Sequence, residues 1–240
     1  MGLAVFVAFC RNVHLVDRFH VQRPVTTKFK SPTTTGEKIV QAARRQIGTA
    51  YNNRYIPIRY PNGDVPAKQG ACTDVVVRSL RGLGYDLQKL IHEDMVRRRS
   101  SYPHWNGIID ASIDHRRCPN QVVFFRKYGE VLTTKVTPAT LLAWQPGDIV
   151  YWRLPMNLDH TGIVSDVVDA HGIPEVIDNG TGCKEEDVLT RWQIVAHFRY
   201  PAPKAPSSGI LATKMPPTKI ARRQASNTRP GMDVHRANVS

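Results

Sequence analysis

The chain has 240 residues, 41% of them hydrophobic, which is enough for one globular domain with a sizeable core and tails. Its net charge of +13 is concentrated at the ends. Residues 1–36 and 201–240 hold 12 Lys and Arg against two acidic residues, so the 164 residues between them carry only +3. This distribution argues against specific nucleic-acid binding, which needs positive charge on a folded face. Basic tails suit an anionic surface such as a bacterial cell wall or phospholipid.

We predict three parts: an N-terminal segment (1–33), a folded domain (34–200) and a basic, disordered tail (201–240). Residues 2–9 are apolar, as in an export signal, but no basic residues precede them. We interpret this run as the remnant of such a signal and expect a periplasmic or secreted protein, with a cytoplasmic location left open. No segment approaches membrane-spanning length, so we expect no transmembrane segment.

The chain contains four cysteines, Cys10, Cys72, Cys118 and Cys183, which are too few for a disulfide scaffold. They show neither a CxxC pair nor Cys/His zinc spacing, and we predict no metal and no cofactor. A bridge between Cys118 and Cys183 is compatible with the sequence, which cannot establish it.

Three helices are predicted in the first half of the chain. Thr34 and Glu37 form a capping-box pattern, followed by an apolar stripe of Ile39, Val40, Ala43 and Ile47. A second helix begins at or just after Cys72 and ends at Gly84. A third begins at the N-cap Asp86, with Leu87, Leu90, Ile91 and Met95 on its apolar face.

The second helix places a cysteine at its N-terminus. There the helix dipole and unpaired N–H groups stabilise a thiolate, and the same N–H groups can hold an oxyanion. Thr73 and Asp74 are residue types that cap a first turn, and Gly70 allows a close approach. The alternative interpretation is that Cys72 is a small buried residue.

Residues 100–120 form a polar and aromatic loop, which indicates either a ligand-facing surface or a structural network of ion pairs. Its polar and aromatic members are Tyr102, His104, Trp105, Asn106, Asp110, Asp114, His115, Arg116 and Arg117.

From residue 122 onward, short apolar runs predict strands, so helices precede an antiparallel sheet and the fold class is α+β. The predicted strands span residues 122–125, 131–136, 148–152, 161–168, 175–177 and 193–200.

Two of these strands carry the remaining chemistry. His160 lies at the start of one, and the antiparallel return brings Asp178 or Asn179 to the same end of the sheet. A simple hairpin count leaves them out of register, so we expect a bulge or an uneven loop. A thiol nucleophile needs a base, and the base needs an orienting group, which Cys72, His160 and Asp178 supply. Taken singly, His160 could be structural and Asp178 part of a turn.

The chain resembles NlpC-type cell-wall peptidases, a papain-like superfamily of cysteine peptidases and amidases. The resemblance covers about residues 37–200. It is carried by Gly48-Thr49-Ala50-Tyr51, Cys72, Pro146-Gly147-Asp148-Ile149-Val150 and His160-Thr161-Gly162-Ile163-Val164. A narrower resemblance, to the YijF-like branch of unknown function, is carried by Tyr60-Pro61-Asn62-Gly63-Asp64, Asp86-Leu87-Gln88, His92-Glu93-Asp94-Met95, Ile113-Asp114-His115-Arg116-Arg117 and Pro119-Asn120.

This resemblance implies a papain-like fold in which Cys72 is the nucleophile, His160 the general base and Asp178 its orienting residue. Tyr51 falls near a tyrosine that shapes the substrate site. We further expect substrate contacts from Thr73, Asp74, Asp114, His115, Arg116 and Asn179. The usual Asp-Cys-Ser-Gly sequence is here Ala71-Cys72-Thr73-Asp74, which removes an acidic residue that recognises the peptide.

We therefore predict a thiol hydrolase acting on an amide bond, with peptidoglycan or another anionic envelope component as its partner. It could serve as a wall enzyme or as a toxin, and a toxin would have an inhibitor or immunity protein as a further partner. Three alternatives stay open: a thiol acyltransferase or lipid-directed enzyme, a non-catalytic envelope-binding module and, last, a metal site using His115, His160 and Asp178.

Overall fold

The computed structural model describes residues 31–103 and 107–202. Its helices precede most of its strands along the chain. The α-helices are α1 (Thr35–Arg44), α2 (Cys72–Arg81), α3 (Leu87–Arg97) and α4 (Cys118–Tyr128). The strands are β1 (Ala50–Tyr51), β2 (Gln69–Gly70), β3 (Glu130–Val131), β4 (Ile149–Leu154), β5 (Leu158–Val168), β6 (Pro174–Asn179), β7 (Cys183–Glu186) and β8 (Gln193–Arg199). Short 3₁₀ helices are η1 (Arg99–Ser101), η2 (Asp114–Arg116), η3 (Leu141–Ala143) and η4 (Pro155–Asn157).

Several predictions fall outside the described residues: the signal remnant, Cys10, the tail beyond residue 202 and the loop residues 104–106. The proposed division into three parts therefore stays a prediction. Within the described residues, none of the helices is both long and apolar enough to cross a membrane.

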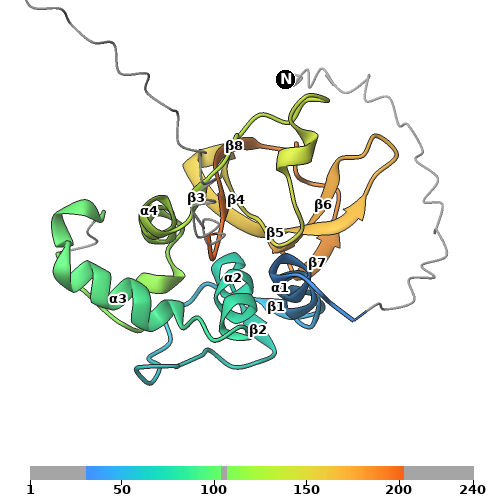
Figure 1. Ribbon diagram of the computed structural model, residues 1–240. Coiled ribbons are helices and arrows are strands. Elements are labelled where there is room, and N and C mark those ends of the chain that lie inside the picture. Colours follow the sequence, from blue (N-terminus) through green and yellow to red (C-terminus); the bar gives the residue numbers. More distant parts are fainter. Residues whose placement is uncertain (1–30, 104–106, 203–240) are drawn as a thin grey trace, which may run out of the picture. The chain divides into compact units, whose positions relative to one another are not determined.

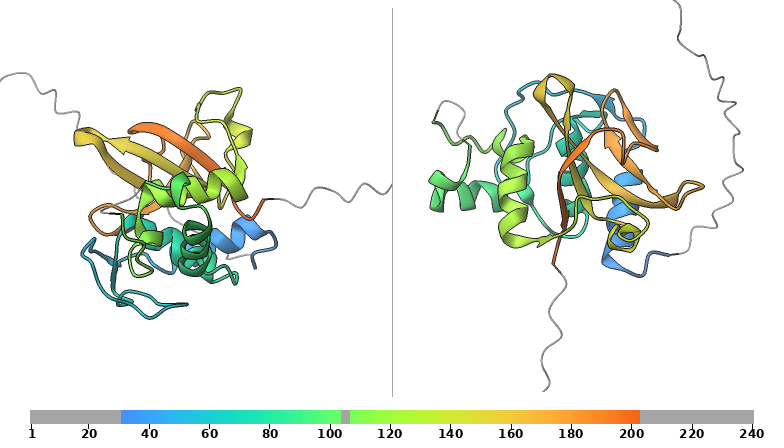
Figure 2. Two further views of the ribbon diagram at one scale, coloured as in Figure 1. Left: turned by 90° about the vertical axis from the view of Figure 1, so that its left-hand side faces the viewer. Right: turned by 90° about the horizontal axis from the view of Figure 1, so that it is seen from above.

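The main sheet has six antiparallel strands in the order β3-β8-β4-β5-β6-β7, while β1 and β2 form a separate parallel pair. Helices α1 and α2 lie side by side against this sheet, with α3 beyond α2 (Figure 1). The other views show the helices gathered on one side of the strands (Figure 2). The predicted α+β class is confirmed.

Successive side chains along each strand point to opposite faces of the sheet, which separates two hydrophobic cores. Ile149 and Tyr151 of β4 pack with the four helices, whereas Val150 and Trp152 point into a smaller core on the opposite face. That second core is covered by loop residues, including Trp144 and Leu189. Both faces of the central strands are therefore buried, which explains their continuous apolar runs.

The first three helices begin where the sequence predicts. Thr34 and Glu37 form the reciprocal capping box, and Asp86 accepts the N–H of Gln88 at the start of α3. The apolar stripe of α1 is shorter than predicted, because Ile47 follows the helix and is 49% exposed. Gly48 adopts a φ of +88°, a left-handed conformation that suits glycine.

The prediction of a strand at residues 122–125 is wrong, since this run belongs to α4. Pro119 in the first turn and basic residues in the last turn favour a helix, and burial of Phe124 and Phe125 outweighs the strand preference of Val and Phe. The strand predicted at 131–136 ends at Val131, after which the chain leaves the sheet to cover the second core. Strand β7 was not predicted, because Cys-Lys-Glu-Glu has no apolar run.

Asp148 explains the Pro146-Gly147-Asp148 motif. Its buried carboxylate accepts hydrogen bonds from His197 Nε2 at 3.0 Å, from Arg199 Nε at 2.8 Å and from the Gln145 N–H at 2.9 Å. His197 also stacks on Trp144, with ring centroids 3.7 Å apart. This network fastens β8 to β4, the strand that also pairs with β5.

We predict that Asp148→Ala destabilises the domain by about 3–5 kcal/mol, because it leaves His197 and the Arg199 guanidinium without their buried anion. Denaturant unfolding followed by circular dichroism measures the change. Glu93→Ala is the control, since Glu93 pairs with Lys89 on the exposed face of α3 and its loss should change stability little. An Asp148→Ala midpoint equal to that of Glu93→Ala would contradict this role.

Candidate active site

Cys72 is the first residue of α2, and the preceding loop is held in place by the helix itself. The Asp74 carboxylate accepts the Ala71 N–H at 2.6 Å, and a Cβ on Gly70 would lie 3.0 Å from the Asp74 Cβ. The absence of a side chain at Gly70 therefore lets Asp74 fold back over the first turn. Within the described residues, the N–H of Cys72 itself has no acceptor, so it is available to a bound group.

His160 and Asp178 lie on the neighbouring strands β5 and β6. His160 Nε2 is 3.1 Å from Asp178 Oδ1, and both side chains are buried. Asp178 pairs directly with Gly162, where a Cβ would lie 3.0 Å from the Asp178 Cβ and 2.6 Å from a Val176 methyl group. The predicted irregularity is confirmed as a register shift between Val164 and Val168. The shift aligns the two strands so that His160 and Asp178 meet.

Two indoles confine the His160 ring. Trp152, directly opposite on β4, stacks on it with centroids 5.6 Å apart, and Trp192 meets it edge-on at 5.9 Å. Trp152 is itself fixed by a hydrogen bond from its Nε1 to the Leu189 carbonyl. These contacts restrict the imidazole to one orientation and shield its bond to Asp178.

The thiol of Cys72 and the ring of His160 form a polar pair. A hydrogen bond with Cys118 lowers the pKa of Cys72, burial opposes this effect, and hydrogen bonds with His160 and the Thr161 N–H contribute further, giving a pKa of about 5. Burial alone would lower the pKa of His160, but hydrogen bonds to Asp178 and Cys72 outweigh it and raise the pKa to about 10. Around neutral pH the pair is therefore a thiolate and an imidazolium.

Of the predicted substrate contacts, Tyr51 is the exposed one. It lies on β1, is 42% exposed, and is close enough to Cys72 and Cys118 for their charges to act on it. Burial raises the pKa of its phenol, so the hydroxyl keeps its proton. Asn179 is buried and donates to the Gly70 carbonyl at 2.9 Å, which ties β6 to the loop before Cys72.

The other predicted contacts lie inside the protein. Arg116 and Asp74 form a buried bidentate ion pair at 2.8 and 2.9 Å, and Thr73 Oγ1 donates to the Arg116 carbonyl. Asp114 accepts the Asp110 N–H and pairs with Arg117. Burial lowers the pKa of His115 to about 3. These buried contacts give Asp74, Asp114, His115 and Arg116 a structural role.

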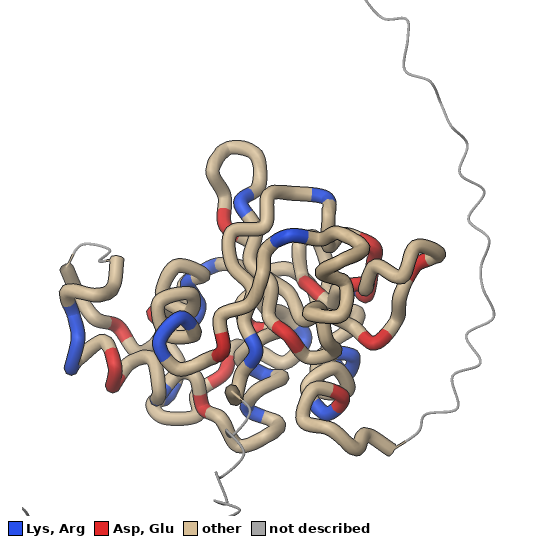
Figure 3. Tube along the Cα trace, turned by 45° about the horizontal axis from the view of Figure 1, so that its top comes forward, with Lys and Arg blue, Asp and Glu red and all other residues tan. Residues whose placement is uncertain are grey.

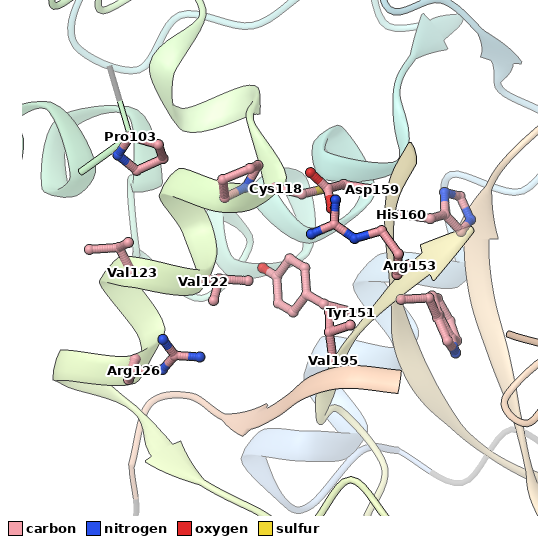
Figure 4. A pocket seen from close by; sticks show the side chains of 12 residues that line it. Pro103, Cys118, Val122, Val123, Arg126, Tyr151, Arg153, Asp159, His160 and Val195 are labelled. Atoms are coloured by element: carbon pink, nitrogen blue, oxygen red, sulfur yellow. The ribbon is translucent and has the colours of Figure 1, made fainter. Parts of the chain in front are cut away.

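A pocket of about 260 Å³ opens beside His160 between α4 and strands β4, β5 and β8 (Figure 4). One wall is a face of α4 that presents Cys118, Val122 and Arg126 at intervals of four residues. The opposite wall holds Tyr151, Trp152, Arg153, Asp159 and Val195, and Pro103 lies at the margin. The strand predicted for residues 122–125 hides this wall, because it includes neither Cys118 nor Arg126 and so does not join them to Val122 on one face.

The structure also places the remaining described cysteines and the residues of the alternative metal site. Cys72, Cys118 and Cys183 are all free and buried, so the bridge left open between Cys118 and Cys183 is not formed in this structure. Among residues 31–103 and 107–202, no three or more His, Cys, Asp or Glu side chains are placed to hold a metal ion. His115, in η2, has no part in the His160–Asp178 pair.

We predict that Asp178→Asn lowers the pKa of His160 from its raised value, because only Cys72 then opposes the effect of burial. NMR titration of the His160 ring measures it, and the wild-type ring should stay protonated well above pH 7. Asp159→Asn is the matched control, since Asp159 adjoins His160 in the chain but pairs with Arg153. A wild-type ring that titrates near 6.5 would contradict the ion pair.

Solved structures with a similar fold come from two groups of proteins. NlpC1 of Trichomonas vaginalis aligns with a TM-score of 0.41 and 14% identity over 72% of this chain and 48% of that one, so the chain spans about half of its length. An N-acetylmuramoyl-L-alanine amidase from Bacteroides uniformis aligns with a TM-score of 0.44 and 11% identity over 69% of this chain and 98% of that one. At these scores the likeness carries no conclusion about chemistry.

The sequence comparisons are far more specific. The chain is 45% identical over 171 residues to the uncharacterized protein YijF of Escherichia coli (strain K12), which covers 69% of this chain and 82% of that protein. Residues 40–200 match DUF1287, described as a domain of unknown function. The predicted YijF-like resemblance is thus confirmed, and the chain belongs to the DUF1287 family.

Proposed function

We propose that this protein is a thiol hydrolase that cleaves an amide bond in peptidoglycan through Cys72, His160 and Asp178. The observation that supports the proposal best is the convergence of three parts on one point. A cysteine at a helix N-terminus meets a histidine that is oriented by a buried aspartate, and the cysteine N–H beside them is unoccupied by any described acceptor. This is the combination that nucleophilic acyl transfer requires.

In the first half of the reaction the Cys72 thiolate attacks the carbonyl carbon of the amide. The oxygen of the tetrahedral intermediate takes the negative charge, and the Cys72 N–H and the protonated Tyr51 hydroxyl are the donors we assign to it. The His160 imidazolium then gives its proton to the leaving nitrogen, the carbon–nitrogen bond breaks, and a thioester on Cys72 remains.

In the second half the neutral His160 takes a proton from a water molecule, which attacks the thioester carbonyl. The carbon–sulfur bond breaks, the acid product leaves, and the thiolate–imidazolium pair is restored. Asp178 holds the Nε2 side of the ring throughout, which leaves Nδ1 to exchange the proton with the reacting groups.

The pocket supports an acidic peptide as the substrate. Arg153 is already paired with Asp159 at 3.1 Å, whereas no described carboxylate lies within ion-pair distance of the exposed Arg126. Along the described trace, Lys and Arg residues are interspersed with Asp and Glu residues (Figure 3). Peptidoglycan stem peptides carry free carboxylates, which Arg126 would bind. This substrate would place the protein in the cell envelope.

A second candidate is acyl transfer from Cys72 to an acceptor other than water. Val122, Val123 and Val195 give the pocket an apolar part that could accommodate the hydrocarbon portion of an acceptor. Adding candidate amines and lipids to the reaction separates the two functions: transfer shows acylated acceptor, whereas hydrolysis gives only the free acid.

We predict that Cys72→Ala abolishes cleavage of purified peptidoglycan fragments, with a loss of about a thousandfold or more in rate because the nucleophile is gone. Mass spectrometry of the released fragments measures cleavage and identifies the bond. Cys183→Ala is the matched control, since it removes another buried thiol outside the site. Equal activity of Cys72→Ala and wild type, with the fold intact by circular dichroism, would refute the hydrolase assignment.

We predict that Arg126→Gln raises KM about tenfold for a fragment with a free carboxylate, equivalent to about 1.4 kcal/mol, and leaves kcat nearly unchanged. A matched fragment with that carboxylate amidated should show no such difference. Lys127→Gln is the control, because the next residue along α4 does not line the pocket. Unchanged KM for both fragments would rule out Arg126 as the carboxylate-binding residue.

A further inference from the structure

Cys118 has no part in the mechanism above, yet its thiol lies at the site. It is the first residue of α4, is buried, and forms part of the wall of the pocket that contains His160. Its thiol shares a hydrogen bond with that of Cys72. The site therefore holds a second free thiol, beside the proposed nucleophile, to which the hydrolase mechanism gives no role.

The position of Cys118 is fixed by bonds that join the start of α4 to the start of α2. Thr73 Oγ1 donates to the Arg116 carbonyl at 3.0 Å, two residues before Cys118. From the first turn of α4, Gln121 Nε2 donates to the His115 carbonyl at 2.8 Å and reaches the Thr73 carbonyl at 3.4 Å. The Tyr151 hydroxyl donates to Gln121 Oε1 at 2.7 Å, which anchors the same group to β4. These bonds hold the two helix starts together, each with a cysteine as its first residue.

We propose that Cys72 and Cys118 are a redox-sensitive modification site, which a peroxide converts into a reversible disulfide that blocks the nucleophile. The pocket brings a small peroxide to Cys118 and His160, which both lie on its wall and both bond the Cys72 thiol. This modification does not depend on the hydrolase reaction, since it needs only the two sulfur atoms and the oxidant.

The chemistry proceeds in two steps. The Cys72 thiolate attacks one oxygen of hydrogen peroxide, a sulfur–oxygen bond forms and the oxygen–oxygen bond breaks. The leaving hydroxide takes a proton from the His160 imidazolium and departs as water, so Cys72 becomes a sulfenic acid. The Cys118 sulfur then attacks the Cys72 sulfur, the sulfur–oxygen bond breaks, and the hydroxyl group leaves as water with the thiol proton. The two thiols lose two electrons in total, and one peroxide is reduced to two waters.

The protonation state of Cys118 depends on the charge of Cys72. While Cys72 is a thiolate, the hydrogen bond to it raises the pKa of Cys118, which keeps Cys118 protonated and the two sulfurs unreactive toward each other. Once Cys72 is a neutral sulfenic acid, that negative charge is gone, and the Cys118 thiol can give its proton to the departing hydroxyl group. Cys183 lies instead on β7, where burial raises the pKa of its thiol to about 12.

The test is oxidation of the full chain, carried in a Cys10→Ser background so that the described cysteines are the only ones present. The reduced protein is treated with a small excess of hydrogen peroxide, and the remaining thiols are alkylated and mapped by peptide mass spectrometry. We expect a peptide joining Cys72 to Cys118 that is lighter by two hydrogens and is lost on reduction with dithiothreitol. Cys183 should be recovered as a free thiol.

Two variants sharpen the test. In Cys118→Ser, Cys72 should still oxidise, but its sulfenic acid should persist, label with dimedone and proceed to sulfinic acid. Cys183→Ser should give the same Cys72–Cys118 link as the parent. Accumulation of sulfinic acid at Cys72 in the parent, without the link, would overturn the proposal, and so would a link of either cysteine to Cys183. Because the readout is sulfur chemistry, it is independent of any failure to find a hydrolase substrate.

Discussion

The contact between Gly162 and Asp178 is the constraint on which the site depends. These residues pair across β5 and β6, and any side chain at position 162 would meet the Asp178 Cβ and a Val176 methyl group. Two residues earlier on β5, His160 points to the same face and reaches the Asp178 carboxylate. A buried imidazole would ordinarily lose its proton, and the carboxylate reverses that preference, which in turn stabilises the thiolate of Cys72.

A second set of interactions brings the nucleophile to this histidine. The first turn of α2 carries Asp74, whose carboxylate accepts hydrogen bonds from the Ala71 N–H and from the buried Arg116 guanidinium. Asn179, the residue after Asp178, bonds the Gly70 carbonyl just before the helix. The loop that ends at Cys72 is thus held from both sides, by η2 and by β6. These contacts hold the start of α2 in one position relative to β6, which is what a part that positions a nucleophile requires.

Much of this could be predicted from the sequence, because local signals mark it. Helix caps at Thr34 and Asp86, a cysteine after a glycine loop, and a histidine and an aspartate at strand ends are all visible in order. Residues 122–125 are wrongly predicted as a strand, since Val-Val-Phe-Phe satisfies strand preference, and the burial of Phe124 and Phe125 that favours the helix has no local signal. That error hid the wall formed by Cys118 and Arg126. The polar residues Asp114, His115 and Arg116 suggested a surface, but their partners come from distant segments, so their burial has no local signal.

The most direct test of the account is the rate at which Cys72 is alkylated as a function of pH. We predict rapid labelling with a midpoint near pH 5, far below the ordinary thiol value of about 8.5, with peptide mapping used to separate Cys72 from Cys118. In His160→Ala the midpoint should move upward, and labelling at neutral pH should become much slower. A wild-type midpoint near 8.5 that is unchanged in His160→Ala would contradict the existence of an activated Cys72–His160 pair.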